Sequence, residues 1–320
     1  MTRPLVLIAS PVLAEANNGN WQTAWRWSRL LAPHYRTQII PSWQAGEHSQ
    51  AVALLALHAR RSAEVIAAWA QAHPGRGLAV VLTGTDLYRD IQRDAAAQRS
   101  LALAQRLVVL QELGPQALPA EHRAKTRAIF QSTTTRRPVD KAVTRLRVVM
   151  VGHLRDEKGP QTLWAAARLL RDRPDIRIDH IGEALDPALG LAARATMADC
   201  PAYRWLGGLP HEATRRHIQR AHLLVHCSRM EGGAHVLMEA VCSGTPVLAT
   251  RIDGNVGMLG ADYAGYFPVD DAAALAQALQ RCRDAPDRVL ALRAQCSLRA
   301  PLFTPTAEQA ALLALLQDLT

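Results

Sequence analysis

Short apolar runs alternate with amphipathic stretches along the whole chain. In the first half, apolar runs of strand length lie at 5–10, 36–41, 78–84 and 106–111. Helical patterns separate these runs, around 23–34, at 52–73 and at 90–105. Strands and helices that alternate in this way are typical of a parallel sheet with helices on both faces.

The alternation pauses over 130–145, FQSTTTRRPVDKAVTR, which follows neither the strand period nor the helix period. We interpret this segment as a linker between domains. Beyond it, the alternation resumes with strands at 146–152, 176–182, 222–228 and 246–250 and helices that begin near Pro160 and Glu212. The predicted fold is α/β, with two Rossmann-like, doubly wound domains that face each other across a cleft. These are 1–135 and 146–305, and a closing amphipathic helix, 306–320, can pack back on the first domain.

Composition indicates a globular protein of the cytoplasm. Of the 320 residues, 49% are hydrophobic and 20% are charged, and no apolar run is long enough to cross a bilayer. The start, MTRPLVLIASPVLAEA, resembles a signal peptide in part, but Pro11 interrupts it and PLVLIAS fits a buried strand better. The five cysteines form no C-x-x-C pair, which favours reduced thiols over a disulfide framework or a zinc site.

The formal net charge of +9 raises the question of a polyanionic partner. The arginines are spread over many helices, and with 5% aromatic residues the chain lacks the basic–aromatic interleaving of single-strand binders. We therefore expect neither a nucleic acid nor a membrane as partner. A small phosphorylated ligand accounts for the charge as well.

Loops that follow strands carry the ligand in doubly wound sheets, and two such loops stand out in the first domain. After the first strand, Asn18, Gly19 and Asn20 precede a helix whose free amides can bind an anion, although an ordinary turn has the same pattern. After the strand at 78–84 comes a second polar group, for which a plain helix cap is the alternative. It comprises Thr85, Asp86 and Tyr88.

In the second domain, the loop GHLRDEKGPQT, 152–162, sets His153, Arg155 and Lys158 before a helix that begins at Pro160. Cations and helix amides together can hold a diphosphate and stabilise its charge as it leaves. The alternative is a solvated loop in which Glu157 offsets Lys158.

The most specific pattern is SRMEGGAHVLMEAVCSGTPVLAT, 228–250. Glu231 and Glu239 have seven residues between them, and Gly232 and Gly233 allow a ligand to approach the amides at the following helix. Two carboxylates so placed suit a long ligand with hydroxyl groups at both ends and phosphates between them. A capping glutamate and an exposed helical glutamate are the alternative.

These motifs resemble the retaining glycosyltransferases of the GT-B fold. EGGAHVLMEAVCSGTPVLATRIDG is similar to their donor-site signature, VGHLRDEKG to their Val-Gly-Arg-Leu…Glu-Lys-Gly loop, and IGE to their Ile-Gly-Glu. The resemblance implies that Glu239 binds the nucleotide ribose, Glu231 the hydroxyls of the transferred sugar, and Lys158 the diphosphate, with Lys158 and Glu231 as the catalytic pair. It also implies that amides near the donor phosphates come from Gly232, Gly233, Ala234 and His235, and from Gly19 and Asn20 in the first domain.

Two positions depart from that family. His153 stands where an arginine usually binds the diphosphate, so that Arg155 or another cation would take its place. Gly233 and Ala234 replace the usual Phe-Gly and leave more space beside the sugar.

NNGNWQTAWRWSRLL, 17–31, and LTGTDLYRDI, 82–91, further resemble the selenosugar synthases of selenoneine biosynthesis. That resemblance implies transfer of a sugar, chiefly from UDP-N-acetylglucosamine, to selenophosphate, with a new carbon–selenium bond and release of UDP. An anionic acceptor needs positioning and cations more than a general base. The expected acceptor contacts are Asn18, Thr85, Asp86, Tyr88, Arg26 and Arg89, with Arg93 as a further candidate.

Two other functions remain open at this point. One is a GT-B glycosyltransferase with a small hydroxylated acceptor, and the other is a basic, non-catalytic nucleotide- or nucleic-acid-binding module. We expect no cofactor beyond the UDP-sugar co-substrate and no metal, because no Asp-x-Asp clamp lies between apolar flanks.

Overall fold

The computed structural model describes residues 3–11 and 19–320. It divides into two compact units. Unit 1 comprises Met1–Ser132 together with Thr304–Thr320, and unit 2 comprises Thr133–Phe303. Residues 129–142, which include most of the predicted linker, contain neither helix nor strand.

Unit 1 is built around a parallel sheet of six strands, counted over its described residues, in the order β2-β1-β3-β4-β5-β6. The bounds are β1 Leu5–Ala9, β2 Arg36–Ile40, β3 Ala51–Leu57, β4 Leu78–Val81, β5 Arg106–Val109 and β6 Thr126–Ala128. The helices are α1 Gly19–Leu31, α2 Ala63–Ala72, α3 Ile91–Arg93, α4 Ala95–Leu103, α5 Ala120–Arg123 and α13 Pro305–Leu319.

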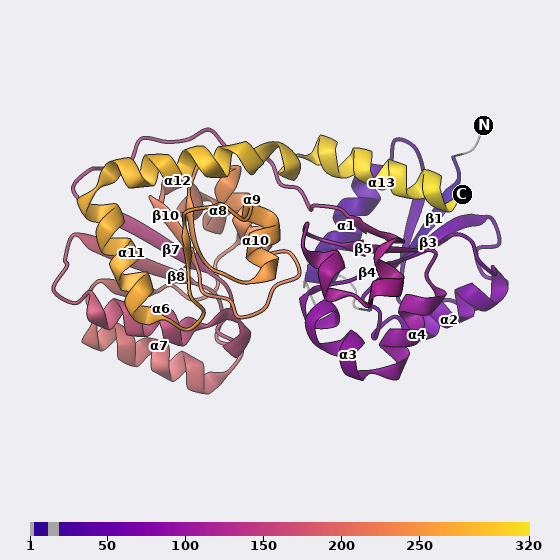
Figure 1. Ribbon diagram of the computed structural model, residues 1–320, viewed down its shortest axis with the longest axis horizontal. Coiled ribbons are helices and arrows are strands. Elements are labelled where there is room, and N and C mark those ends of the chain that lie inside the picture. Colours follow the sequence, from indigo (N-terminus) through magenta and orange to yellow (C-terminus); the bar gives the residue numbers. More distant parts are fainter. Residues whose placement is uncertain (1–2, 12–18) are drawn as a thin grey trace. The chain divides into compact units, whose positions relative to one another are not determined.

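Alternation of side chains along the strands of unit 1 supplies two separate cores. In β1, Val6 and Ile8 pack with α1 and α13 on one face of the sheet. Leu5 and Leu7 face the opposite side, where α2 and α4 pack. Figure 1 shows α13, at the end of the chain, beside α1. All five β1 residues are buried, as the sequence pattern of a central parallel strand predicts.

The prediction of one helix over 52–73 is wrong. Residues Ala51–Leu57 form β3, and the helix is confined to Ala63–Ala72. The run AVALLAL is apolar at every position because β3 lies between β1 and β4 and is covered on both faces. Such a run carries no period that distinguishes a strand from a buried helix. The strand ends at Leu57, because the next residue, His58, has a φ of 75° that does not continue a strand.

The predicted helix over 90–105 is interrupted. A π-helical turn, Asp86–Asp90, leads into α3, and Asp94 then starts α4. The carboxylate of Asp94 accepts hydrogen bonds from the amides of Ala96 and Ala97, both at 2.9 Å. A residue that caps a new helix has a non-helical backbone, so the preceding helix ends before Asp94.

Unit 2 holds a second parallel sheet, which has six strands among the residues described, in the order β12-β11-β10-β7-β8-β9. The strands are β7 Leu146–Val151, β8 Ile176–Ile181, β9 Tyr203–Trp205, β10 Leu223–His226, β11 Val247–Thr250 and β12 Tyr266–Phe267. The helices are α6 Pro160–Leu169, α7 Pro187–Asp199, α8 His211–Arg220, α9 His235–Val241, α10 Asp253–Leu259, α11 Ala272–Asp284 and α12 Pro286–Arg299.

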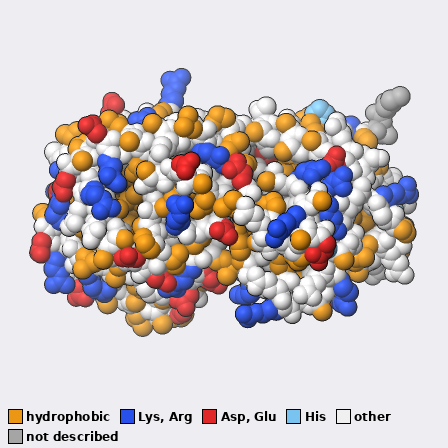
Figure 2. Space-filling view, in the orientation of Figure 1, with side chains coloured by type: hydrophobic (Ala, Val, Ile, Leu, Met, Phe, Trp, Pro, Cys, Tyr) orange, Lys and Arg blue, Asp and Glu red, His pale blue; other side chains and the backbone are white. Residues whose placement is uncertain are grey.

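Helices cover both faces of the second sheet. On one face α6 packs against α7 and α11, and on the other α9 packs against α8 and α12 (Figure 1). Cys227 and Cys242 are buried here. On the face of unit 2 that Figure 2 shows, basic and acidic side chains are interspersed. Among the residues described, no helix has both the length and the apolar character that a bilayer crossing requires.

Candidate functional site

The order in which strands are added to the sheet of unit 2 reverses between β7 and β10, which are parallel neighbours. From β7 the chain continues outward through β8 and β9, and from β10 it continues the other way through β11 and β12. In doubly wound sheets, ligands bind in the crevice outside the carboxyl ends of the strands at such a switch point, and here the loops that leave β7 and β10 lie at that place. The loops concerned are 152–159 and 227–234, the two that the sequence analysis selected in this domain.

Lys158 and Glu231 meet in this crevice. Nζ of Lys158, from the loop after β7, donates a hydrogen bond to Oε1 of Glu231, from the loop after β10, at 2.5 Å. Nε2 of His226, the last residue of β10, lies 3.4 Å from the same oxygen. The Glu231 side chain is 12% exposed and that of Lys158 22%. The two predicted catalytic residues thus form one ion pair.

Glu231 is ionised in this setting. Burial by itself would raise the pKa of its carboxyl group, but the charge of Lys158 and the hydrogen bond from His226 outweigh burial and hold that pKa well below the usual range. Within the described residues, Oε2 of Glu231 accepts no hydrogen bond, because Lys158 and His226 both contact Oε1. One oxygen is therefore held in place and the other is left for a ligand.

Two glycines bring the backbones of the site close together. Gly159 has φ of 60°, and a Cβ there would lie 2.4 Å from the carbonyl oxygen of Cys227. A Cβ on Gly254, in α10, would lie 2.0 Å from the carbonyl oxygen of Glu231. Larger residues at either position would push one loop away from its neighbour.

Arg229 joins the two loops. Its backbone amide donates to the carbonyl of Glu157 at 2.8 Å, and its guanidinium donates to the carbonyl of Asp156 and to the carboxylate of Asp270. Glu157 is thus bound through its backbone. The sequence left open that Glu157 offsets the charge of Lys158. In the structure, Lys158 pairs with Glu231 instead.

Glu239 lies on α9 and is buried, with 6% of its side chain exposed. Its Oε1 is contacted by Nε2 of His211 at 2.6 Å and by Nδ1 of His235 at 3.4 Å, and Nη1 of Arg215 lies 3.9 Å away. An exposed helical glutamate is therefore excluded. As with Glu231, the residues described leave Oε2 of Glu239 without a hydrogen bond.

The pKa of Glu239 falls to about 2. Burial would raise it, but the hydrogen bonds from His211 and His235 and the charge of Arg215 lower it more. In return, the carboxylate raises the pKa of His211. A carboxylate that is ionised at neutral pH and has one free oxygen is suited to accept a hydrogen bond from a diol.

Arg215 is a buried cation that the sequence analysis missed. It donates to Oγ1 of Thr133 at 2.5 Å, to the carbonyl of Thr134 at 2.8 Å and to Oγ of Ser243 at 3.4 Å. His226, His211 and Gly254 were also missed. His226 immediately precedes the selected loop 227–234, whereas His211 and Gly254 lie at the starts of α8 and α10, so only His226 carried a positional signal.

His153 acts as a hydrogen-bond acceptor at Nδ1. The amide of Glu183 donates to that atom at 3.1 Å, and burial together with Arg155 and Lys158 lowers the pKa of His153. A neutral ring that accepts at Nδ1 carries its proton on Nε2. His153 therefore offers a donor without a full charge, and Arg155 is exposed.

The amides near the start of α9 are only partly free. Gly232 and Gly233 lie in the loop before this seven-residue helix, and His235 is its first residue. The amide of Ala234 donates to Sδ of Met258 at 3.2 Å. Sulfur is a weak acceptor.

In unit 1, Gly19 and Asn20 form the first turn of α1 instead of a loop before it, and Asn18 lies outside the described residues. Arg26 is drawn into a buried cluster at α13, where its Nε donates to Oε2 of Glu308 at 2.9 Å. The indole of Trp27 and the amide of Ser132 donate to the same carboxylate.

In the second polar loop of unit 1, neither Thr85 nor Asp86 caps a helix with its side chain. Thr85 makes no side-chain cap, and the carboxylate of Asp86 accepts from the amide of Ala59 at 2.7 Å. Tyr88 accepts from the amide group of Gln111 at 2.9 Å. Arg89 is half exposed and lies 3.3 Å from the carboxylate of Asp90.

One group in the described part of the chain has the composition of a metal site. Potential ligand atoms of His58, Asp86 and Asp90 lie within 4.8 Å of one another. However, Nδ1 of His58 faces Asp86 at 3.2 Å, and Nε of Arg60 binds Asp90 at 2.9 Å. Hydrogen bonds and ion pairs within the described residues therefore already use both carboxylates.

Comparison with known proteins gives the same picture for fold and family. The family model described as "Glycosyl transferases group 1" matches residues 131–300. Sucrose-phosphate synthase from Thermosynechococcus elongatus superposes with a TM-score of 0.75 at 19% identity, over 99% of both chains. HepE of Anabaena, solved with UDP and glucose, gives 0.75 at 13% identity, over 98% of this chain and 99% of that one.

The pneumococcal O-GlcNAc transferase GtfA, solved with UDP and GlcNAc, gives a TM-score of 0.65 at 18% identity, over 83% of this chain and 57% of that one. At these identities the likeness establishes the fold. The predicted α/β class with two doubly wound sheets is confirmed, and it is the GT-B architecture of these glycosyltransferases.

Proposed function

Because the chain belongs to the group 1 glycosyl transferases, we propose that it transfers a sugar from a UDP-sugar, with UDP-N-acetylglucosamine as the expected donor. The observation that carries this proposal is the pair of buried, ionised glutamates, Glu231 and Glu239, at the crevice between β7 and β10. Structures of HepE and GtfA, which share the fold, were solved with UDP.

The proposed roles follow from which oxygens are free. Oε2 of Glu239 is the acceptor for the ribose diol, while His211 and His235 hold Oε1. Oε2 of Glu231 is the acceptor for a hydroxyl of the transferred sugar. Lys158 is close enough to Glu231 to be positioned by it, and it neutralises the diphosphate as the bond to the sugar breaks.

The ion pair with Glu231 suits catalysis because it holds Lys158 in position and leaves part of its ammonium group free. A lysine held by one carboxylate oxygen at 2.5 Å keeps two further N–H groups for phosphate oxygens. Its position is fixed before the donor binds, so no rearrangement opposes charge development on the leaving UDP. His153 adds an uncharged donor at Nε2 to the same loop.

For the acceptor, we propose selenophosphate. The selenium atom attacks the anomeric carbon, a carbon–selenium bond forms, and the bond from that carbon to the diphosphate oxygen breaks. UDP leaves with the electron pair. Support comes from the resemblance of 17–31 and 82–91 to selenosugar synthases, and from the chemistry of an acceptor that is already anionic and requires no proton removal.

The alternative acceptor is a small hydroxylated molecule. One observation favours it, since GtfA, which shares the fold, is described as an O-GlcNAc transferase. The same donor site would serve both reactions, and only the atom that attacks the anomeric carbon would differ.

The test is to incubate the purified protein with UDP-N-acetylglucosamine and selenophosphate, orthophosphate or a small hydroxylated acceptor. Orthophosphate is the matched control, because it presents oxygen in place of selenium. We expect UDP release and a carbon–selenium product by mass spectrometry with selenophosphate alone. UDP release only with a hydroxylated acceptor would overturn the selenophosphate proposal, and failure to bind any UDP-sugar would overturn the donor proposal.

A further inference from the structure

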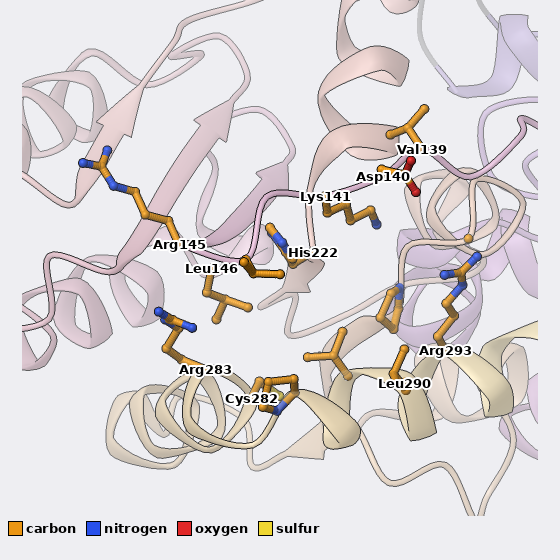
Figure 3. Close-up of a pocket in the computed structure, with 15 residues that line it drawn as sticks. Val139, Asp140, Lys141, Arg145, Leu146, His222, Cys282, Arg283, Leu290 and Arg293 are labelled. Carbon is orange, nitrogen blue, oxygen red and sulfur yellow. The ribbon is translucent and has the colours of Figure 1, made fainter.

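A cavity of about 300 Å³ lies in unit 2 (Figure 3). It lies at the amino ends of the strands, whereas Glu231 and Lys158 follow their carboxyl ends. Leu146 is the first residue of β7, and His222 and Pro246 immediately precede β10 and β11, so the cavity opens where strands begin. The loop 139–145 and the helices α11 and α12 form its remaining walls.

The walls of the cavity are largely apolar. Val139, Val143 and Leu290 line it, although 38%, 85% and 59% of each is exposed. Large aliphatic side chains that remain in water beside a cavity gain free energy when an apolar group covers them, at about 25 cal/mol per Å². Further lining comes from Leu146, Pro246, Cys282, Pro286 and Val289.

Two cations that form no ion pair within the described residues lie at one end of the cavity, and Figure 3 shows Asp140 on the same side. Nζ of Lys141 donates only to Oγ1 of Thr245, at 3.3 Å, and Figure 3 shows Lys141 and Arg293 on the same side of the cavity. In the described part of the chain, neither pairs with a carboxylate, and the lining residue Asp140 is exposed. Burial and the charge of Arg293 lower the pKa of Lys141 to about 8.

The other basic residues of the cavity already have partners or point elsewhere. Arg283 binds Oδ2 of Asp175 at 2.7 Å, and both ring nitrogens of His222 bond to the backbone. Figure 3 shows Arg145 extending away from Lys141 and Arg293. Lys141 and Arg293 are therefore the pair that an anion would satisfy.

We propose that this cavity is a second binding site, for a small organic anion whose apolar body packs between the loop 139–145 and α12 and whose charged group binds Lys141 and Arg293. The site lies apart from the donor crevice, at the other end of the strands. Such a ligand connects the segment that follows unit 1 to the last long helix of unit 2. It also holds Lys141 protonated, so binding weakens as pH rises through about 8.

The experiment measures binding of phenyl phosphate and benzoate to the full-length protein by calorimetry. Inorganic phosphate tests charge alone and phenol tests the apolar part alone. We expect the organic anions to bind at least tenfold more tightly than either control. Preference for phenyl phosphate or for benzoate then identifies the charged group of the ligand as phosphate or carboxylate.

Variants place the binding in this cavity. Lys141→Met and, separately, Arg293→Gln are expected to raise the Kd at least tenfold, and the second serves if the first does not fold. Arg288→Gln, an exposed arginine on the same helix, and Lys158→Met, in the donor crevice, are expected to leave the Kd unchanged. The proposal is overturned if phenol binds as tightly, if both cavity variants bind normally, or if Lys158→Met abolishes binding.

Discussion

Glu239→Gln is the most informative single substitution, because it removes a charge and preserves the shape of the side chain. The carboxylate of Glu239 is 6% exposed, and its Oε1 lies 2.6 Å from His211 and 3.4 Å from His235. An amide there cannot balance the charge of Arg215 or of protonated His211. It also offers a weaker acceptor to the ribose diol that we assign to Oε2.

The expected loss of stability follows from the pKa. Lowering the pKa of Glu239 from 4.5 to about 2 corresponds to about 3 kcal/mol of stabilisation, at about 1.36 kcal/mol for each pH unit. Because the pKa is lower in the folded state, this contribution is present above pH 4.5 and is lost as pH falls toward 2. The raised pKa of His211 acts in the opposite sense, and its contribution is lost as pH rises above that pKa.

The difference in unfolding free energy between wild type and Glu239→Gln should therefore be greatest near pH 5–6, decline above neutrality and vanish near pH 2. Urea denaturation at a series of pH values measures it. In parallel, calorimetry should show a UDP affinity that is weaker by about 1–3 kcal/mol, a 5- to 150-fold rise in Kd, as for a lost hydrogen bond to a charged group.

Glu212→Gln is the matched control, because Glu212 lies on the neighbouring helix α8 with 62% of its side chain exposed. It should leave the affinity for UDP unchanged. A Glu239→Gln protein with wild-type affinity for UDP would refute the ribose assignment. A difference in stability that does not vary with pH would refute the electrostatic reasoning.

Four further predictions follow from the same geometry. Lys158→Met should lower turnover at saturating UDP-sugar about 100- to 1,000-fold, as for loss of a charge-stabilising donor, and a rate within threefold of wild type would contradict its role. Glu231→Gln should lower turnover and change UDP affinity little, because Glu231 is assigned to the sugar; a loss of UDP affinity with normal turnover would reverse the assignment. Gly159→Ala should destabilise the fold by about 1–3 kcal/mol through strain at φ of 60°, whereas Gly19→Ala, with open space around it, should not lower Tm. EDTA should leave turnover unchanged, and reactivation by added Mg²⁺ or Mn²⁺ would contradict this.

Where the sequence and structure agree, the signal was local. The strand at Leu5–Ala9, the helix that begins at Pro160 and the loops around Lys158 and Glu231 all carry their own pattern, because burial on both faces of a parallel sheet produces short runs of Val, Ile and Leu. Where they disagree, the local signal was ambiguous. The stretch 51–57 is apolar at every position, and only its pairing with β1 and β4 decides that it is a strand.

The sequence by itself determined the α/β class, with strands and helices alternating in both halves, and the loops that hold the acids and cations, since both follow from periodicity and from residue type at strand ends. Only the tertiary structure decided which of these groups meet. It pairs Lys158 with Glu231, surrounds Glu239 with His211 and His235, and draws Arg26 away to Glu308. The physical reason is that pairing of strands distant in sequence sets which loops are adjacent, and burial then requires each charge to find a partner that no local pattern specifies.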